Sequence, residues 1–220
     1  MSEIKAVIFD LDNTIGNRDA YAYSLFKHIL VHSIEDIETN PLLLEAMLQD
    51  LLLWDAYGDS KKDEIFSKFE KKYKTRILFP EEVGTYWDNN LGNYYVNYEG
   101  VYELFDYLKP KYKLGLITNG PSFGQRLKIN NSNLKAYFDC ICISEEIRSA
   151  KPDRTIFNTC LDKLGVNPEE AIFIGDSFSI DIKGAIDAGM RAIWVRQDPY
   201  KPCEYPIKII QNIRELYEFL

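Results

Sequence analysis

Short apolar segments that alternate with helical patterns constrain the fold of this chain more than any other feature. Beyond residue 100 these segments are β-prone, and stretches of helical periodicity separate them. Together with a similar segment near the N-terminus, the predicted strands cover 4–9, 113–118, 139–144, 171–175, 191–195 and 207–210. Near-continuous apolar strands alternating with helices are typical of a parallel sheet with helices on both faces. The sequence therefore predicts an α/β fold.

A helical insertion separates the first predicted strand from the others. Residues 19–93 contain several amphipathic helical patterns broken by short polar stretches, and typical helix lengths give about four helices. We therefore expect two domains: an α/β core formed by 1–17 and 97–220, and an α-helical domain formed by 18–96. Within the core the clearest helices are 152–164, with Pro152 at or near its first position, and about 179–188.

The net charge of the chain argues against nucleic-acid polymers and anionic membranes as partners. The 220 residues include 34 acidic and 26 basic ones, for a net charge of −8. An acidic chain is a poor match for a nucleic-acid polymer or an anionic membrane, so we expect neither partner. No signal segment or membrane span is predicted, and Cys140 and Cys142 alternate along a strand as small core residues rather than as a redox pair. A reducing, cytoplasmic location is expected.

Polar residues follow four of the predicted strands, where each strand ends. Ligands of an open α/β sheet bind outside the carboxyl ends of its strands, so these positions are candidates for one site. The candidate residues are Asp10 and Asp12 after the first strand, Thr118 and Asn119 after the second, Lys151 after the third and a short loop, and Asp176 and Asp181 after the fourth.

This set of side chains suits magnesium-assisted phosphoryl transfer. Mg²⁺ prefers carboxylate oxygens, which Asp10 and Asp176 can supply, and the ion would relieve the repulsion between neighbouring acids. Lysine, hydroxyl and amide groups can hold the phosphoryl oxygens. A positioned Asp10 can then attack phosphorus to form an aspartyl-phosphate, while Asp12 moves protons as a general acid and base.

The motifs D-L-D-N-T at 10–14, T-N at 118–119, Lys151 before a proline, and G-D-S-x-x-x-D at 175–181 resemble the four ordered motifs of the haloacid dehalogenase (HAD) superfamily. The core sequence is particularly similar to the subgroup of nucleoside 5′-monophosphate phosphatases and N-acylneuraminate-9-phosphatase. The resemblance implies a Rossmann-like core with an inserted type-1 α-helical cap domain. Position 13, commonly Gly in that superfamily, is Asn here, which tolerates a left-handed backbone.

The resemblance also implies a role for each matching residue. Asp10 would be the nucleophile and a metal ligand, and Asp12 the acid and base whose main-chain carbonyl also binds the metal. Asp176 would be a direct metal ligand, and Asp181 a ligand or a partner of one. The remaining three residues would bind the phosphoryl group and balance its charge: Thr118, Asn119 and Lys151.

These observations favour a cytoplasmic, magnesium-dependent phosphatase that acts on a small phosphorylated metabolite, a nucleoside monophosphate or a sugar phosphate, as a monomer or dimer. Two alternatives stay open: a phosphomutase on the same scaffold, and a non-catalytic binding or regulatory protein. Each motif also has a simpler interpretation, since strand-end acids can face water and Asn-Gly is a common turn. Asp181 can be a first-turn helix acid, and Arg18 is a possible substrate contact.

Overall fold

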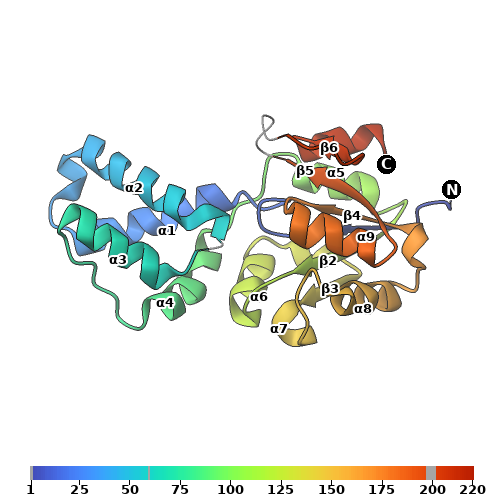
Figure 1. The fold of residues 1–220 in the computed structure, drawn as a ribbon, viewed down its shortest axis with the longest axis horizontal. Coiled ribbons are helices and arrows are strands. Elements are labelled where there is room, and N and C mark those ends of the chain that lie inside the picture. The colour runs from blue at the N-terminus through green and yellow to red at the C-terminus, as the bar shows by residue number, and fades with distance from the viewer. Residues whose placement is uncertain (1, 59, 197–201) are drawn as a thin grey trace. The chain divides into compact units, whose positions relative to one another are not determined.

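The computed structural model describes residues 2–58, 60–196 and 202–220. Two compact units make up the chain (Figure 1). The first, here called the α/β unit, comprises Met1–Gly16 and Asn97–Leu220, and the second, the helical unit, comprises Asn17–Val96.

Within the described residues, the α/β unit contains one parallel sheet of six strands. Their order is β3-β2-β1-β4-β5-β6, with the first and fourth strands of the sequence side by side. The strands are β1 Ala6–Phe9, β2 Lys113–Thr118, β3 Cys140–Ile143, β4 Ala171–Gly175, β5 Arg191–Val195 and β6 Lys208–Ile210. The predicted Rossmann-like α/β fold is confirmed.

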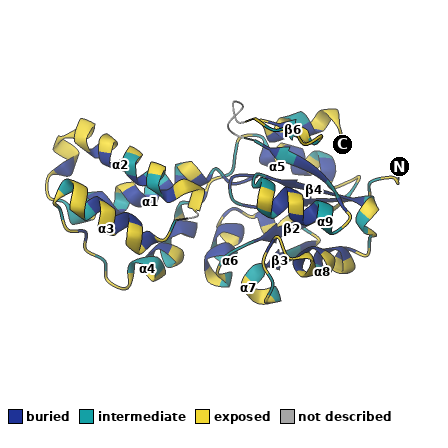
Figure 2. Cartoon of the chain, viewed as in Figure 1, coloured by how far each residue is buried: buried dark blue, intermediate teal, exposed yellow. Residues whose placement is uncertain are grey.

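Helices cover both faces of this sheet, because alternate side chains of the central strands point to opposite sides. On one face, Ile8 of β1 belongs to a fully buried cluster with Phe157 of the helix α8. On the other face, Phe9 meets Phe105 of α5 edge to face, with ring centroids 5.2 Å apart. Figure 2 shows these strands in the dark blue of buried residues. The helices are α5 Val101–Leu108, α6 Ser122–Asn131, α7 Ser144–Ile147, α8 Arg154–Leu164 and α9 Lys183–Asp187.

The strand order reverses between β1 and β4. Chain connections leave β1 toward β2 on one side and β4 toward β5 on the other, so the carboxyl ends of β1 and β4 form the topological switch point, where ligands of such sheets bind. The register pairs Phe9 with Ile174, so Asp10 and Gly175 come next to each other where both strands end. The residues that follow these two strands therefore meet at one place.

Two local predictions differ from the structure. Pro152 precedes α8 rather than opening it, since Asp153 caps the helix by accepting a hydrogen bond from the Thr155 N–H at 2.8 Å. The predicted helix over 179–188 is a π-helical turn at Phe178–Ile182 followed by α9. The last helical segment is a 3-10 helix at Ile213–Glu218.

The cysteines of β3 are core residues, as predicted. Cys140 and Cys142 are buried on one face of the strand with their sulfur atoms 3.6 Å apart, and Cys160 of α8 packs in the same cluster.

The helical unit contains α1 Arg18–Ser33, α2 Pro41–Asp55, α3 Lys62–Tyr73 and α4 Val83–Asn90. Asparagines cap two of these helices, because the side chains of Asn17 and Asn40 accept hydrogen bonds from main-chain N–H groups of the first turns. The aromatic ring of Phe26 packs against those of Phe66 and Trp87, with centroids 5.9 and 4.4 Å away. Among the described helices, none combines the length and apolar composition required to cross a bilayer. The assignment of 18–96 as a cap domain stays a prediction.

A buried ion cluster lies inside the helical unit. Asp55, 1% exposed, contacts Arg18 through one carboxylate oxygen and the Lys62 ammonium, 2.5 Å away, through the other. Arg18, considered above as a substrate contact, is thus held by Asp55. Gly58 leaves room for it, since a Cβ atom at that position would stand 2.7 Å from the guanidinium Nε.

Candidate active site

Asp10 is the first residue after β1, and the sheet itself fixes its place. Its main-chain N–H donates to the carbonyl of Ile174 at 2.9 Å, which continues the β1–β4 pairing by one residue. The buried carboxylate is held at both oxygens: Lys151 Nζ lies 2.5 Å from Oδ1, and Thr14 Oγ1 donates to Oδ2 at 3.1 Å. A nucleophile or ligand at this position would therefore have a fixed orientation.

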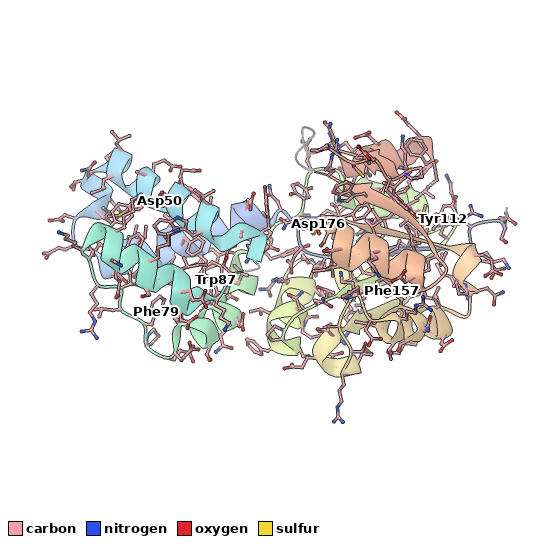
Figure 3. All side chains as sticks on the ribbon, viewed as in Figure 1. Asp50, Phe79, Trp87, Tyr112, Phe157 and Asp176 are labelled. Carbon is pink, nitrogen blue, oxygen red and sulfur yellow. The ribbon has the colours of Figure 1, made fainter. Side chains whose placement is uncertain are left out.

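Two further carboxylates meet Asp10 from the end of β4. Oxygen atoms of Asp10, Asp176 and Asp181 all lie within 4.8 Å of one another. Lys151 reaches this cluster from the loop before α8, and its Nζ lies 2.7 Å from Asp181 Oδ1. Figure 3 labels Asp176, which is half-buried in the α/β unit. Three acids face one ammonium group here, so the cluster carries an excess of negative charge when ionised.

Gly175 allows Asp181 to enter this cluster. A Cβ atom on Gly175 would stand 2.5 Å from the Cβ of Asp181, closer than side chains pack. The Ser177 N–H then donates to Asp181 Oδ2 at 2.9 Å, which leaves Oδ1 toward Lys151. The π-helical turn at Phe178–Ile182 carries Asp181. π-Helical turns are frequent at functional sites, because they displace a side chain from its α-helical position.

Burial and repulsion between neighbouring carboxylates raise the pKa of Asp10 and that of Asp176. Burial is the largest cause that raises the pKa of Asp10, the Lys151 charge opposes it, and the Asp181 charge adds to it, giving a pKa of about 7. Burial and the charges of Asp10 and Asp181 likewise raise the pKa of Asp176 well above its ordinary value. Burial alone would lower the pKa of Lys151, but the Asp10 and Asp181 carboxylates outweigh it, and the pKa is raised.

The donor set fits a divalent cation. Hard ions such as Mg²⁺ take oxygen ligands, and one or two carboxylates with water and phosphate oxygens are the usual set. Asp10, Asp176 and Asp181 present such oxygens at one point. Within the described residues, Asp181 Oδ1 is buried and accepts no well-aligned hydrogen bond, so its only compensation is the charge of Lys151. These carboxylates could hold the ion.

The Asn119 side chain, which we expected to bind the phosphoryl group, forms hydrogen bonds with the main chain of Lys151. Its Nδ2 donates to the main-chain carbonyl of Lys151 at 3.0 Å, and its Oδ1 accepts from the Lys151 N–H at 2.9 Å. Both polar groups of the side chain are thereby directed to one residue. Asn119 fixes the main chain that carries Lys151, and we expect any phosphate contact from Asn119 to come from its main-chain N–H.

Asp12 lies on the turn that follows β1, and helix α6 holds its side chain. Lys128 Nζ lies 2.9 and 2.8 Å from the two carboxylate oxygens, and Gln125 Nε2 lies 3.1 Å from one of them. The next residue, Asn13, has a φ of 62°, the left-handed conformation expected for it. This turn separates Asp12 from Asp10, so the two acids have different partners.

Sequence reasoning missed two residues of this site, Gln125 and Lys128, and gave no role to Thr14. Thr14 was inside a recognised motif, but nothing local showed that its hydroxyl group bonds Asp10. Gln125 and Lys128 are three residues apart on a helix that starts soon after Thr118, a spacing that places them on one face. That spacing, on the helix after a motif-bearing strand, was the signal that could have identified them.

This chain is similar to known proteins of one enzyme family along almost its whole length. Residues 7–195 match the family of haloacid dehalogenase-like hydrolases. The chain is 27% identical to N-acylneuraminate-9-phosphatase of Homo sapiens over 232 residues (98% of this chain and 93% of that protein). It is 26% identical to the pyrimidine 5′-nucleotidase YjjG of Escherichia coli (97% and 96%).

Solved structures show the same fold. The crystal structure of the putative HAD-hydrolase YfnB of Bacillus subtilis, bound to magnesium, superimposes with a TM-score of 0.73 at 24% identity, covering 99% of this chain and 98% of that one. The family match spans the first strand, the helical unit and the sheet through β5. The predicted enzyme class is confirmed: this chain belongs to the haloacid dehalogenase-like hydrolases.

Proposed function

We propose that this protein is a magnesium-dependent phosphatase that hydrolyses a small phosphorylated metabolite through an aspartyl-phosphate on Asp10. One observation carries the proposal: a buried, doubly held carboxylate meets two further carboxylates and a single lysine at the switch point of the sheet. A cluster with that excess of buried negative charge is stable when a cation or protons balance it.

Asp10, Asp176 and Asp181 would hold the magnesium ion. The ion would supply positive charge that offsets the negative charge of the phosphoryl group as it approaches the carboxylates. The protein's own groups then complete the phosphate site. Lys151 contributes a fixed cation, and Thr118 contributes a hydroxyl group at the end of β2.

The reaction would proceed in two displacements. A carboxylate oxygen of Asp10 forms a bond to phosphorus while the bond between phosphorus and the leaving-group oxygen breaks. Asp12 gives a proton to the leaving-group oxygen. Water then attacks the same phosphorus atom and loses a proton to Asp12. The bond between Asp10 and phosphorus breaks, which releases phosphate and restores both acids.

The named relatives support a small phosphorylated metabolite as substrate. They include an N-acylneuraminate-9-phosphatase, a pyrimidine 5′-nucleotidase and the glyceraldehyde 3-phosphate phosphatase of Methanopyrus kandleri, which is 29% identical over 91% of this chain and 88% of its own. We propose a nucleoside monophosphate or a sugar phosphate for this chain, with residues 18–96 as the cap domain that the family resemblance implies.

A phosphate-release screen with nucleoside monophosphates, sugar phosphates, triose phosphates and phosphoglycolate tests this function. We expect release with Mg²⁺ and none with EDTA. The Asp10→Asn variant keeps the size of the side chain but lacks the nucleophilic oxygen, so its rate should fall at least about 10³-fold. Activity retained by Asp10→Asn would exclude the aspartyl-phosphate, and formation of an isomeric phosphate without release would identify a phosphomutase.

A further inference from the structure

Two buried side chains of α6 meet the group that the proposed mechanism needs for proton transfer. Gln125 is 3% exposed and Lys128 is 5% exposed, and both point to Asp12, more than 110 residues earlier in the chain. Neither belongs to the carboxylate cluster that could hold a metal. Their polar groups are directed instead at the acid and at the neighbouring phosphate site.

The Gln125 amide connects Asp12 to Thr118. Its Nε2 carries two hydrogens and lies within hydrogen-bonding distance of three acceptors: Thr118 Oγ1, Asp12 Oδ2 at 3.1 Å and the Asn119 carbonyl oxygen at 3.0 Å. Carboxylate and carbonyl oxygens only accept hydrogen bonds, so the amide nitrogen, and not its oxygen, must face them. The Thr118 hydroxyl group is therefore an acceptor toward Gln125, and its hydrogen is directed elsewhere. One amide thus orients both a phosphate-binding hydroxyl group and the acid.

The Lys128 ammonium holds the Asp12 carboxylate at both oxygens, at 2.9 and 2.8 Å. The side chain of Lys128 is 6% exposed and that of Asp12 is 23% exposed. Separating a buried ammonium group from its carboxylate partner is strongly destabilising, so the ion pair with Lys128 resists rotation of the Asp12 side chain. Two contacts from Lys128 and one from Gln125 leave the carboxylate little freedom.

The turn after β2 provides space for this arrangement. Gly120 has a φ of 139°, which side-chain-bearing residues rarely adopt, and a Cβ atom there would stand 3.3 Å from the Gln125 side chain. The absence of a side chain at Gly120 thus leaves space for the Gln125 side chain beside this turn.

We propose that Gln125 and Lys128 are positioning residues for Asp12. They hold its carboxylate where it can exchange a proton with the leaving oxygen and with the attacking water. The inference rests on the proposed function, because it assumes that Asp12 is the general acid and base. Neither residue contacts the phosphoryl group in this role: Lys128 acts through Asp12, and Gln125 acts through both Asp12 and Thr118.

The dependence of the rate on the leaving group tests this role. A poor alkoxide leaving group needs a proton from Asp12, whereas p-nitrophenolate leaves without one. We expect Lys128→Met to lower kcat/KM for an alkyl phosphate, the best substrate from the screen, by about 10- to 100-fold. The same variant should lower kcat/KM for p-nitrophenyl phosphate less than about threefold. Asp12→Asn should give the same pattern with larger losses, since general acid catalysis contributes about 10²–10⁴-fold.

Three variants complete the experiment. Lys128→Arg should restore most of the alkyl phosphate activity. Gln125→Leu also loses the Thr118 contact, so it should lower kcat/KM for both substrates, and more for the alkyl phosphate than for p-nitrophenyl phosphate. Arg126 is a cation of the same helix and pairs with Glu146 at the surface. Arg126→Met should therefore leave kcat/KM unchanged for both substrates. Its thermal midpoint and that of Lys128→Met show whether both variants fold.

Equal losses for the two substrates in folded Lys128→Met and Gln125→Leu, with no rescue by arginine, would overturn the positioning role. That result leaves the phosphatase proposal intact, because wild type would still release phosphate and Asp10→Asn would not. If wild type hydrolyses no phosphomonoester, both proposals are wrong.

Discussion

At the scale of single residues, the buried Asp10 carboxylate shows how the site balances its charge. A loop aspartate is ordinarily solvated, but this one is 6% exposed and shares its surroundings with two more acids. Lys151 supplies one positive charge, which is insufficient for three carboxylates. The remainder must come from protons or a cation, and this competition gives the site a measurable pH dependence.

Metal-free protein should become less stable as the pH rises toward 7. The pKa of Asp10 is about 7 in the folded chain and 3.8 in its ordinary state, so between these values the folded state binds the extra proton. The stabilisation that this proton provides is complete below pH 3.8. It falls by about 1 kcal/mol for each pH unit between 3.8 and 7 and is lost above pH 7. Urea unfolding in EDTA at pH 5 to 8 measures this slope. Asp10→Asn should flatten it, and an unchanged slope in that variant would assign the effect to other groups.

Gly175→Ala should disturb Asp181 directly. The new methyl group would collide with the Asp181 side chain, so we expect a stability loss of about 1–3 kcal/mol and a large loss of magnesium-dependent activity. Gly165→Ala is the matched control. Gly165 has a φ of 64° and its nearest Cβ contact is 3.8 Å away, so backbone strain alone should lower its stability by about 1 kcal/mol and leave activity unchanged. Equal activities in the two variants would contradict the role given to Gly175.

At the scale of elements, the buried ion cluster ties α2 to the beginnings of α1 and α3. Asp55 is the last residue of α2, Arg18 the first of α1 and Lys62 the first of α3. Burial lowers the pKa of Lys62, although the Asp55 carboxylate opposes that effect. The Asp55 carboxylate forms an ion pair with each of these two cations.

Asp55→Asn should therefore destabilise the helical unit by about 3–5 kcal/mol, because two buried cations lose the charge that they share. The matched control is Asp50→Asn, which removes a carboxylate of the same helix from the exposed pair with Lys72 and should change stability by at most about 1 kcal/mol. Trp54 and Trp87 both lie in this unit, so a Trp194→Phe background reports its unfolding by fluorescence. Similar losses in the two variants would argue against a special role for the cluster.

At the scale of the whole molecule, the proposed metal site lies entirely within one of the two units. All three carboxylates and Lys151 belong to the α/β unit, and so does Trp194, whose indole N–H donates to the Asp176 carbonyl at 2.6 Å. A ligand that binds only the folded α/β unit should stabilise that unit in proportion to its saturation.

Magnesium at one hundred times its dissociation constant should raise the unfolding free energy of the α/β unit by about 2.7 kcal/mol. Trp194 fluorescence in a Trp54→Phe/Trp87→Phe background measures the shift. Asp176→Asn should abolish it, whereas Asp187→Asn, which removes an exposed acid of the same unit, should not. A full shift in Asp176→Asn would show that the ion binds elsewhere.

The sequence by itself determined the fold class and the strand ends at which the candidate residues converge. Apolar strands with helices between them require a parallel sheet, and parallel strands end at one edge, so polar residues after four strands had to converge there. This reasoning located Asp10, Asp176 and Lys151, and the left-handed Asn13, because each depends on a local pattern. It also gave β2, β4 and β5 their observed bounds.

Only the tertiary structure decided how these residues are paired. Strand order places β4 beside β1, which brings Asp176 to Asp10, and no local pattern encodes that order. The Asn119 side chain binds the main chain of Lys151, and α6 brings Gln125 and Lys128 to Asp12 across more than 110 residues. Such contacts join segments that are independent in the sequence, and packing of the complete core selects them.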